Sequence, residues 1–542
     1  MTDLLRAVRT LCVGVLLAIA AGSVPDGVRA APAAGSPATA AAAQDTADAP
    51  TATEPRQNEA DPEGVTGGLE RVDGAAGLEP GQVEVGSARA DLDTTLLQRL
   101  QSVLGLAILL LIAWGLSTNR RRIPWRVAAW GLSLQLVFAL FILRTPAGES
   151  IFAALNNVVV ELLGYTEDGA RFLFGNLVLN NIPVGLGEPG NVPPSGDPGM
   201  VANAGAFFAF NVLPTIIFFS SLMAVLYHLG VMQLVVKGVA WVMMRTMRTS
   251  GAETLSAAGN IFVGQTEAPL LIKPFVEKMT MSELNAVMVG GFATVAGGVL
   301  AAYVGMLVAF FPDIAGHLIA ASVMSAPAAL VVAKIMVPEE TVPETKDSLS
   351  VHVESLDANV IDAAARGAGD GLRLAANVGA MLLAFVALVY MFNGLLGWGS
   401  DLLGITSALQ ARGAIPPDSP LTLQALLGWI FAPLAWVMGV PWDDAVQIGS
   451  LMGIKTVLNE FFAFLDLSVL LTSGADLSPR SIVIATYALA GFANFSSIAI
   501  QIGGIGGIAP SRKSDLAILG LRAMIGGTIA AFLTATVAGM VL

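Results

Sequence analysis

Two glutamates of this sequence stand inside long apolar stretches. Glu267 lies in the run GQTEAP, and Glu460 in the run KTVLNEF. A charged side chain at the centre of a bilayer costs on the order of 3 kcal/mol or more, so a carboxylate there predicts a functional hydrogen-bond acceptor. The alternative is that Lys273 and Lys455 neutralise these glutamates, which would then only hold helices together.

Asn494 and Ser497 are three residues apart, and a helix would present both on one face. Buried Asn and Ser often only join helices, which is the alternative here. With the two glutamates, they supply acceptors and amide donors without a cluster of arginines. This combination predicts a neutral ligand rich in hydroxyls and amide-like edges, rather than a phosphate or a dicarboxylate.

Oxygen atoms suited to a sodium ion are expected at two helix breaks. Asn260 precedes a break that frees the carbonyl of Val263, and Thr294 stands beside the carbonyl of Val295 at a second break. Side-chain and unwound backbone oxygens are the ligands with which membrane transporters hold sodium. The alternative is that Asn260 and Thr294 are structural.

Enzymatic chemistry has little support in the sequence. The histidines are His228, His317 and His352, which are far apart and lack a metal-binding spacing. The single cysteine, Cys12, lies in the N-terminal apolar run, which excludes disulfides and thiolate catalysis from the mature chain. We therefore expect no enzyme and no soluble cofactor.

The composition requires a membrane protein. The chain has 542 residues, of which 55% are hydrophobic and 13% charged, and apolar stretches of about 20 residues recur from Leu96 onwards. Backbone amides cannot stay unpaired in hydrocarbon, so these stretches must be helices. The predicted fold class is an all-α polytopic membrane protein of the cell inner membrane, with about eight transmembrane helices and two re-entrant hairpins.

The N-terminal region differs from the rest in composition. Much of the net charge of -13 comes from acids between Asp45 and Asp93. We therefore expect residues 31–94 to be a disordered, acidic, periplasmic tail. Residues 1–30, with Arg6 and Arg9 before an apolar run, are typical of a secretory signal peptide, and the alternative is an uncleaved extra helix.

The positive-inside rule orients the spans, because Arg120–Arg122 should remain cytoplasmic. This places the tail and the C-terminus in the periplasm. The expected segments are three scaffold spans in 95–230 with a periplasmic loop at 146–205, an interfacial helix at 231–250, a first repeat at 251–337, a cytoplasmic connection at 338–373, a scaffold span at 374–397, a periplasmic or interfacial segment at 398–442, and a second repeat at 443–542.

The repeats are predicted from two copies of Gly-Phe-Ala. One copy begins at Gly291 and the other at Gly491, and each follows a broken segment that carries one of the glutamates. The alternative is chance similarity between helices rich in small residues. Loop charges give the two copies opposite orientations, which predicts an inverted-topology repeat, the architecture in which secondary transporters form a midplane site from broken helices.

At these residues the sequence resembles the concentrative nucleoside transporter family. The matching runs are LPTIIFF from Leu213, GNIFVGQTEAPL from Gly259, NEF from Asn459, and GFANFSSIAIQIG from Gly491. The resemblance covers about residues 96 to 542. It implies a homotrimer in the lipid bilayer with an elevator-like transport unit in each protomer, a uridine-like nucleoside substrate with purines as an extension, and no nucleic-acid partner.

The resemblance also implies roles for individual residues. The residues expected near the nucleoside are Gln265, Thr266 and Glu267 on the base side, Val299 in the base pocket, Phe492 packed near the ligand, and Glu460, Asn494 and Ser497 at the ribose. The residues expected around sodium are Asn260, Val263, Thr294 and Val295, with Thr294 where some relatives have serine.

The resemblance implies sodium-driven symport of nucleosides into the cell. Some bacterial relatives use protons and lack parts of the Asn-Thr pattern, so the pattern found here favours sodium. The alternatives are proton-coupled nucleoside symport and symport of another small neutral metabolite.

Overall fold

The computed structural model describes residues 94–178, 181–183, 201–203, 208–346 and 357–542. The expected signal peptide at 1–30 lies outside the described residues, as does the tail at 31–94 except for its last residue. Regular structure in the described part is helical apart from two short antiparallel strands, β1 (Asn181–Pro183) and β2 (Val201–Asn203). The all-α expectation is therefore confirmed in its main feature.

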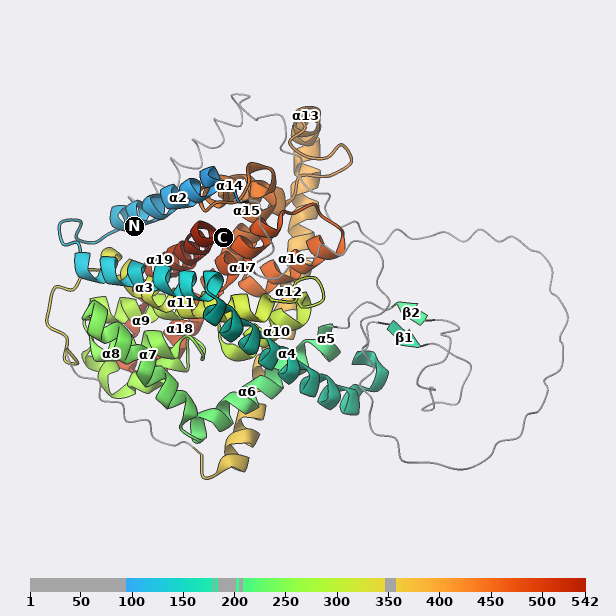
Figure 1. Cartoon of the computed structure of the whole chain (residues 1–542). Coiled ribbons are helices and arrows are strands. Elements are labelled where there is room, and N and C mark those ends of the chain that lie inside the picture. Colours follow the sequence, from blue (N-terminus) through green and yellow to red (C-terminus); the bar gives the residue numbers. More distant parts are fainter. Residues whose placement is uncertain (1–93, 179–180, 184–200, 204–207, 347–356) are drawn as a thin grey trace, which may run out of the picture.

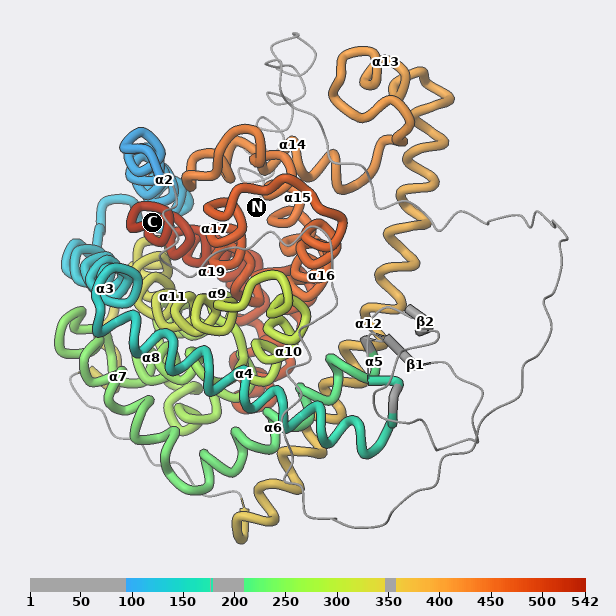
Figure 2. The backbone as a smooth tube through the Cα atoms, turned by 45° about the vertical axis from the view of Figure 1, so that its right-hand side comes forward, coloured from blue at the N-terminus to red at the C-terminus, as the bar shows by residue number. Residues whose placement is uncertain are grey.

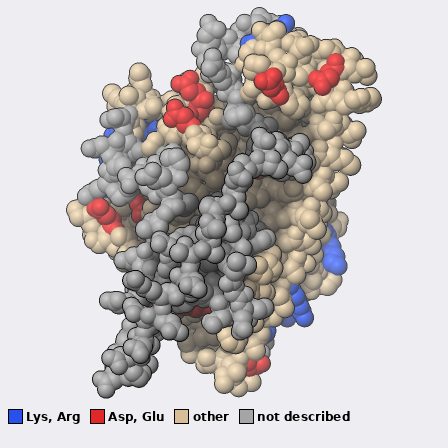
Figure 3. Space-filling model, turned by 90° about the vertical axis from the view of Figure 1, so that its right-hand side faces the viewer, with Lys and Arg blue, Asp and Glu red and all other residues tan. Residues whose placement is uncertain are grey.

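Seven stretches of the described chain are long and apolar enough to cross a membrane. They contain α2 (Leu96–Gly115), α3 (Trp125–Arg144), α5 (Phe208–Asn211) with α6 (Leu213–His228), α9 (Met281–Ala293) with α10 (Gly297–Leu307), α11 (Ile314–Met336), α12 (Val360–Leu402), and η3 (Pro510–Arg512) with α19 (Lys513–Val541). The bent pair α14 (Leu423–Val437) and α15 (Trp442–Val457) would make an eighth. Uncharged residues also make up most of the described surface that Figure 3 shows.

The expected loop at 146–205 begins with a long helix. This helix is α4 (Pro146–Phe174), and η1 (Gly175–Val178) follows it. The hydroxyl of Thr145 caps α4 by accepting from the backbone N–H of Gly148, and proline at the first helical position suits a helix start. Phe152 of α4 packs edge-on against the ring of His317 in α11, with 5.0 Å between ring centroids. The first half of this segment is therefore packed structure.

The helix α7 (Val231–Met247) occupies most of the segment that was expected to be interfacial, and α13 (Ile405–Ala411) precedes α14. Residues with positive φ bound α7 at both ends, namely Gly230 at 80° and Arg248 at 56°. The left-handed conformation is a common way to end a helix, so the chain turns sharply on either side of α7.

The helix α12 is longer than the expected span. It has 43 residues and begins at Val360, within the segment that was expected to be a connection. At about 1.5 Å per residue its length exceeds the hydrocarbon thickness of a bilayer. Gly367 and Gly371 let its first half lie close against α6, because a β carbon at either position would come within 2.8 Å of α6 atoms. Figures 1 and 2 show α12 along one side of the molecule, with α13 near one end.

The helices α9, α11 and α19 contact one another and form the centre of the core. Every residue of α9 after Met281 is buried, and nearly all of α11 is buried as well. Both tube and ribbon views place these helices inside the bundle, with α2, α3 and α4 outside them (Figures 1 and 2). Side chains on the central helices therefore face protein.

Two parts of the chain contain the same order of elements. The first has α8 (Gly251–Gly259), η2 (Ala268–Lys278), the broken pair α9–α10, and then α11. The second has α15, α16 (Glu460–Thr472), the broken pair α17 (Pro479–Leu489) and α18 (Phe495–Ile508), and then α19. In both, a glutamate stands at or beside the turn of the first helix pair. We call these two parts the first and second repeat copies, the packed pair α8–η2 the first hairpin, and the packed pair α15–α16 the second hairpin.

Candidate functional site

The two helix breaks touch each other at the Gly-Phe-Ala copies. Gly491 has a φ of 142°, and a β carbon there would lie 2.9 Å from the carbonyl oxygen of Phe292. At Gly291, a β carbon would lie 2.8 Å from Nε2 of Gln501 and 2.9 Å from Cβ of Gln265. Contacts under 3.0 Å leave no room for a side chain, so glycine is required where the breaks meet.

Glu460 lies at one end of a buried polar network. It is the first residue of α16, where Asn459 caps the helix by accepting from the N–H of Phe462 at 3.0 Å. The hydroxyl of Tyr303 donates to Oε1 of Glu460 at 3.0 Å, and Nδ2 of Asn494 donates to Oε2 at 3.0 Å. A helix N-terminus also favours a negative charge. The carboxylate is therefore held from three directions.

The network continues from Asn494 into the first hairpin. Asn494 caps α18, and its Oδ1 accepts from the backbone N–H of Ser497 at 2.9 Å. Nε2 of Gln265 donates to the Ser497 hydroxyl at 3.1 Å. Nε2 of Gln501 in turn donates to Oε1 of Gln265 at 3.0 Å. Side chains from both repeat copies therefore meet in one chain of hydrogen bonds.

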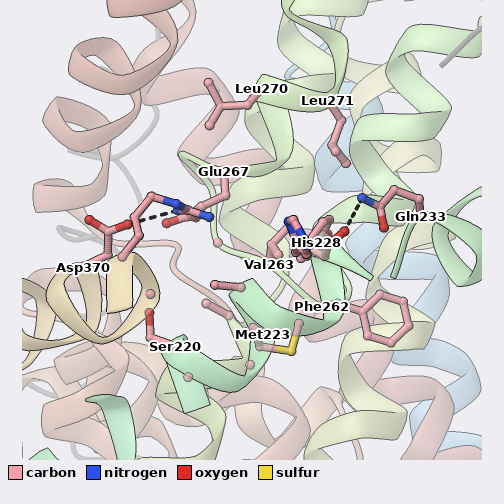
Figure 4. A pocket seen from close by; sticks show the side chains of 18 of the residues that line it. Ser220, Met223, His228, Gln233, Phe262, Val263, Glu267, Leu270, Leu271 and Asp370 are labelled. Carbon is pink, nitrogen blue, oxygen red and sulfur yellow. Dashed lines mark hydrogen bonds and ion pairs between the residues drawn. The ribbon is translucent and has the colours of Figure 1, made fainter. Parts of the chain in front are cut away.

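The three polar residues at the turn of the first hairpin diverge. Gln265 is buried in the network, whereas Thr266 lies against Gly504 of α18, where a β carbon would come 2.7 Å from its Cγ2. Glu267 is exposed and its carboxylate folds over Gly264. Figure 4 shows Glu267 at a cavity of about 700 Å³, with Asp370 of α12 beside the same space. No direct hydrogen bond joins Glu267 to the network among the described residues.

The cavity lies between the first hairpin and the helices α6 and α12. Val263 and Glu267 of the first hairpin line it together with Met223 of α6, as Figure 4 shows. Arg366 of α12 also lines it. Arg366 binds both carboxylate oxygens of Asp357, at 2.5 and 2.9 Å, and also Asp370 at 3.3 Å. The Arg366 hydrogen bonds hold the pKa of the Asp357 carboxyl below its usual value. One wall of the cavity is therefore a network of charges.

The residues expected around sodium are brought together in part. Asn260 is fully buried, and neither Oδ1 nor Nδ2 has a hydrogen-bond partner among the described residues. A β carbon at Gly290 of α9 would lie 3.4 Å from this amide, and the Thr294 hydroxyl donates to the carbonyl of Gly290 at 3.0 Å. The backbone N–H of Gly297 also donates to the carbonyl of Phe262 at 3.1 Å. The hairpin turn and the α9–α10 break are thus adjacent.

The remaining expected residues lie near this region. Val263 lines the cavity, while Val295 is buried at the α9–α10 break and Val299 on the first turn of α10. Phe492 is half-buried at the α17–α18 break. Among the described residues no ion pair joins Lys455 to Glu460, and the Lys455 ammonium donates to the carbonyl of Ala488 at 2.7 Å.

Two members of the network, Tyr303 and Gln501, were not predicted from the sequence. Gln501 follows Ser497 by four residues in the same motif, so helical spacing placed it on the same face. Tyr303 follows Val299 by four residues in the other repeat copy. Spacing alone does not reveal its contact with Glu460, because that contact crosses between distant parts of the chain.

Comparisons with known families agree with these motifs. The family models described as Na+ dependent nucleoside transporter N-terminus and C-terminus match residues 104–177 and 317–539. A model described as nucleoside recognition matches residues 209–310, which include the first hairpin and the α9–α10 break. Together the matches cover more than half of the chain.

Individual relatives resemble this chain over most of its length. An uncharacterized transporter of Haemophilus influenzae is 43% identical over 449 residues, covering 81% of this chain and 97% of that protein. Solute carrier family 28 member 3 of Mus musculus is 40% identical and covers 83% of this chain, and Sodium/nucleoside cotransporter 1 of Rattus norvegicus is 39% identical and covers 82%. The chain spans only 60% and 64% of these two mammalian proteins.

Solved structures show the same likeness. CNTnw in an inward-facing substrate-bound state is 43% identical, with a TM-score of 0.70, and the match covers 82% of this chain and 97% of that one. A CNTnw variant in an outward-facing state gives a TM-score of 0.72 at 41% identity, covering 82% of this chain and 98% of that one. This chain is therefore a multi-pass membrane protein that belongs to the family of sodium-dependent, concentrative nucleoside transporters.

Proposed function

We propose that this protein carries nucleosides into the cell in symport with sodium. The observation that carries the proposal is the buried network in which Glu460 and Asn494 of one repeat copy reach Ser497 and then Gln265 of the other. A ribose presents neighbouring hydroxyls that can donate to a carboxylate, and a nucleobase edge pairs with an amide. The network has both kinds of group and is at the meeting point of the two helix breaks.

In this proposal, Glu460, Asn494 and Ser497 bind the ribose, and Gln265 reads the base. Glu460 is bonded to Asn494 and Ser497 to Gln265, so a nucleoside would exchange these existing hydrogen bonds for new ones. Four further residues would complete the binding site: Thr266 and Glu267 at the base, Val299 in an apolar base pocket, and Phe492 against the ligand.

The proposed sodium site comprises Asn260, Thr294 and the carbonyls of Val263 and Val295. A fully buried amide oxygen without a partner is costly, and a cation bound to Oδ1 of Asn260 would satisfy this oxygen. Such an ion would join the hairpin turn to the α9–α10 break. Its ligand Asn260 lies five residues before Gln265 in the sequence. Symport requires this kind of link, because an ion can shift only an equilibrium whose two states it binds unequally.

The wider arrangement is also part of the proposal. The pairs α8–η2 and α15–α16 would be re-entrant hairpins in oppositely oriented repeats, and these would move together as an elevator-like unit against α6 and α12. The protein would be a homotrimer in the inner membrane, with its tail and C-terminus in the periplasm. The cavity between the first hairpin and the α6–α12 pair supports this division, because it lies at the boundary between the two groups of helices.

The test is uptake of labelled uridine into proteoliposomes under an inward sodium gradient, compared with an inward proton gradient. We expect accumulation with sodium, loss of accumulation in Glu460→Gln, and normal accumulation in Glu340→Gln, which removes a surface carboxylate that contacts Asn119. Free uracil should not compete if the ribose is recognised. Proton-driven accumulation would refute the ion assignment, and no uptake under either gradient would refute the substrate assignment.

A further inference from the structure

A buried ammonium group lies at the junction of the second hairpin with its broken helix. Lys455 of α15 is fully buried, and its Nζ donates to the carbonyl of Ala488 at 2.7 Å. The ring of Phe532 in α19 lies below this ammonium, with 5.7 Å from Nζ to the ring centroid. Ala488 is in the last turn of α17, immediately before the break at 490–494. Neither the proposed nucleoside site nor the sodium site uses this lysine.

A lysine in this position needs a reason, because burial of its charge is unfavourable. An apolar side chain of similar size would fill the same space without loss of hydration. The ammonium adds a positive charge at the C-terminal end of α17. The last carbonyls of the helix lack helical partners there, and this end carries the negative partial charge of the helix dipole. A charge on Lys455 would therefore stabilise the α17–α18 break from the side of the hairpin.

The first repeat copy has a different arrangement at the same kind of junction. There the hairpin helix α8 faces α9 through small residues, since a β carbon at Gly290 would lie 3.7 Å from the Cα of Ala257. One buried polar group at this junction is Asn260, whose amide has no partner among the described residues. One junction thus has an unsatisfied oxygen that suits an exchangeable cation, and the other has a cation attached to the chain.

We propose that Lys455 is a tethered cation that holds the second hairpin on the α17–α18 break, so that this junction needs no exchangeable ion. The inference rests on the proposed function. Lys455 acts as a positioning residue. Glu460 lies five residues further along the same hairpin, and it must meet Asn494, the last residue of the break. The ammonium joins α15 to α17 and thereby fixes the distance between these two side chains.

The first experiment compares substitutions that separate charge from volume. Lys455→Met keeps a long apolar side chain without charge, and Lys455→Arg keeps the charge. We expect uridine uptake by Lys455→Met to fall at least about tenfold, with a raised KM, and Lys455→Arg to retain more activity than Lys455→Met. Lys237→Ala, at an exposed position on α7, is the control and should behave like the parent. Parental uptake by Lys455→Met would overturn the proposal.

The second experiment supplies the missing cation in solution. Lys455→Ala removes three carbons and the ammonium, which together correspond to propylammonium. This ion should raise the uptake and the melting temperature of Lys455→Ala, while propanol, its neutral equivalent, should not. Equal effects of propylammonium and propanol would overturn the proposal. The melting temperature can be measured whether or not the protein transports uridine. If the parent protein failed to take up uridine, the proposed function would be refuted, and the melting temperatures would still test the role of Lys455.

Discussion

Replacing Tyr303 with phenylalanine should weaken nucleoside binding without disturbing the fold. The Tyr303 ring stacks on Phe464 with 4.4 Å between centroids and meets Phe461 edge-on at 5.4 Å. Phenylalanine can keep both contacts, so the substitution removes only the hydroxyl that donates to Glu460. The change therefore isolates one hydrogen bond to a charged acceptor.

The expected magnitude follows from the groups that remain. A hydrogen bond to a charged group contributes about 1.5–3 kcal/mol. Glu460 keeps the bond from Asn494 and its place at the start of α16, so the lower end of this range applies. A loss of about 1.4 kcal/mol corresponds to about tenfold weaker binding. We expect the Kd for uridine in Tyr303→Phe to rise by about this factor.

The assay is isothermal titration of the purified protein with uridine in sodium buffer. Tyr487→Phe is the matched control, because Tyr487 is equally buried but its hydroxyl lies 3.3 Å from Nδ1 of His317, outside the network. Since Tyr303 acts through Glu460, adding Tyr303→Phe to Glu460→Gln should cause little further loss. An unchanged Kd in the single variant, or additive losses in the double variant, would refute the reasoning.

Three further predictions concern the rest of the site. Asn260→Ala should raise the sodium concentration that gives half-maximal uptake by about tenfold or more, whereas the affinity for uridine at saturating sodium should change little. An unchanged sodium dependence of uptake would contradict the ion site. Gln501→Leu should raise the KM for uridine several-fold, because Gln265 loses the donor that orients it; purified Gln501→Leu with parental KM would contradict this. Gly491→Ala should lower the melting temperature by several degrees, because its β carbon would meet the Phe292 carbonyl, whereas Gly503→Ala, at an open position, should melt like the parent.

The sequence by itself determined the class of the protein and most of its helices. Apolar length and the need to pair every backbone amide are local properties, so the spans around α2, α3 and α11 could be predicted from composition alone. The motifs around Glu267, Glu460 and Asn494 also showed the family, because unusual polar residues in apolar surroundings are visible without coordinates.

Only the tertiary structure decided where these groups point and what they meet. The first turns of α12 contain Asp362, Arg366 and Asp370 and look like a connection, yet they are helical and pack on α6 through Gly367. Gln265 and Glu267 are two residues apart, but one enters the buried network and the other faces the cavity.

The contact of Tyr303 with Glu460 joins residues 157 positions apart. The physical reason is that hydropathy and helical spacing report local environment, whereas such contacts depend on how distant helices pack against one another.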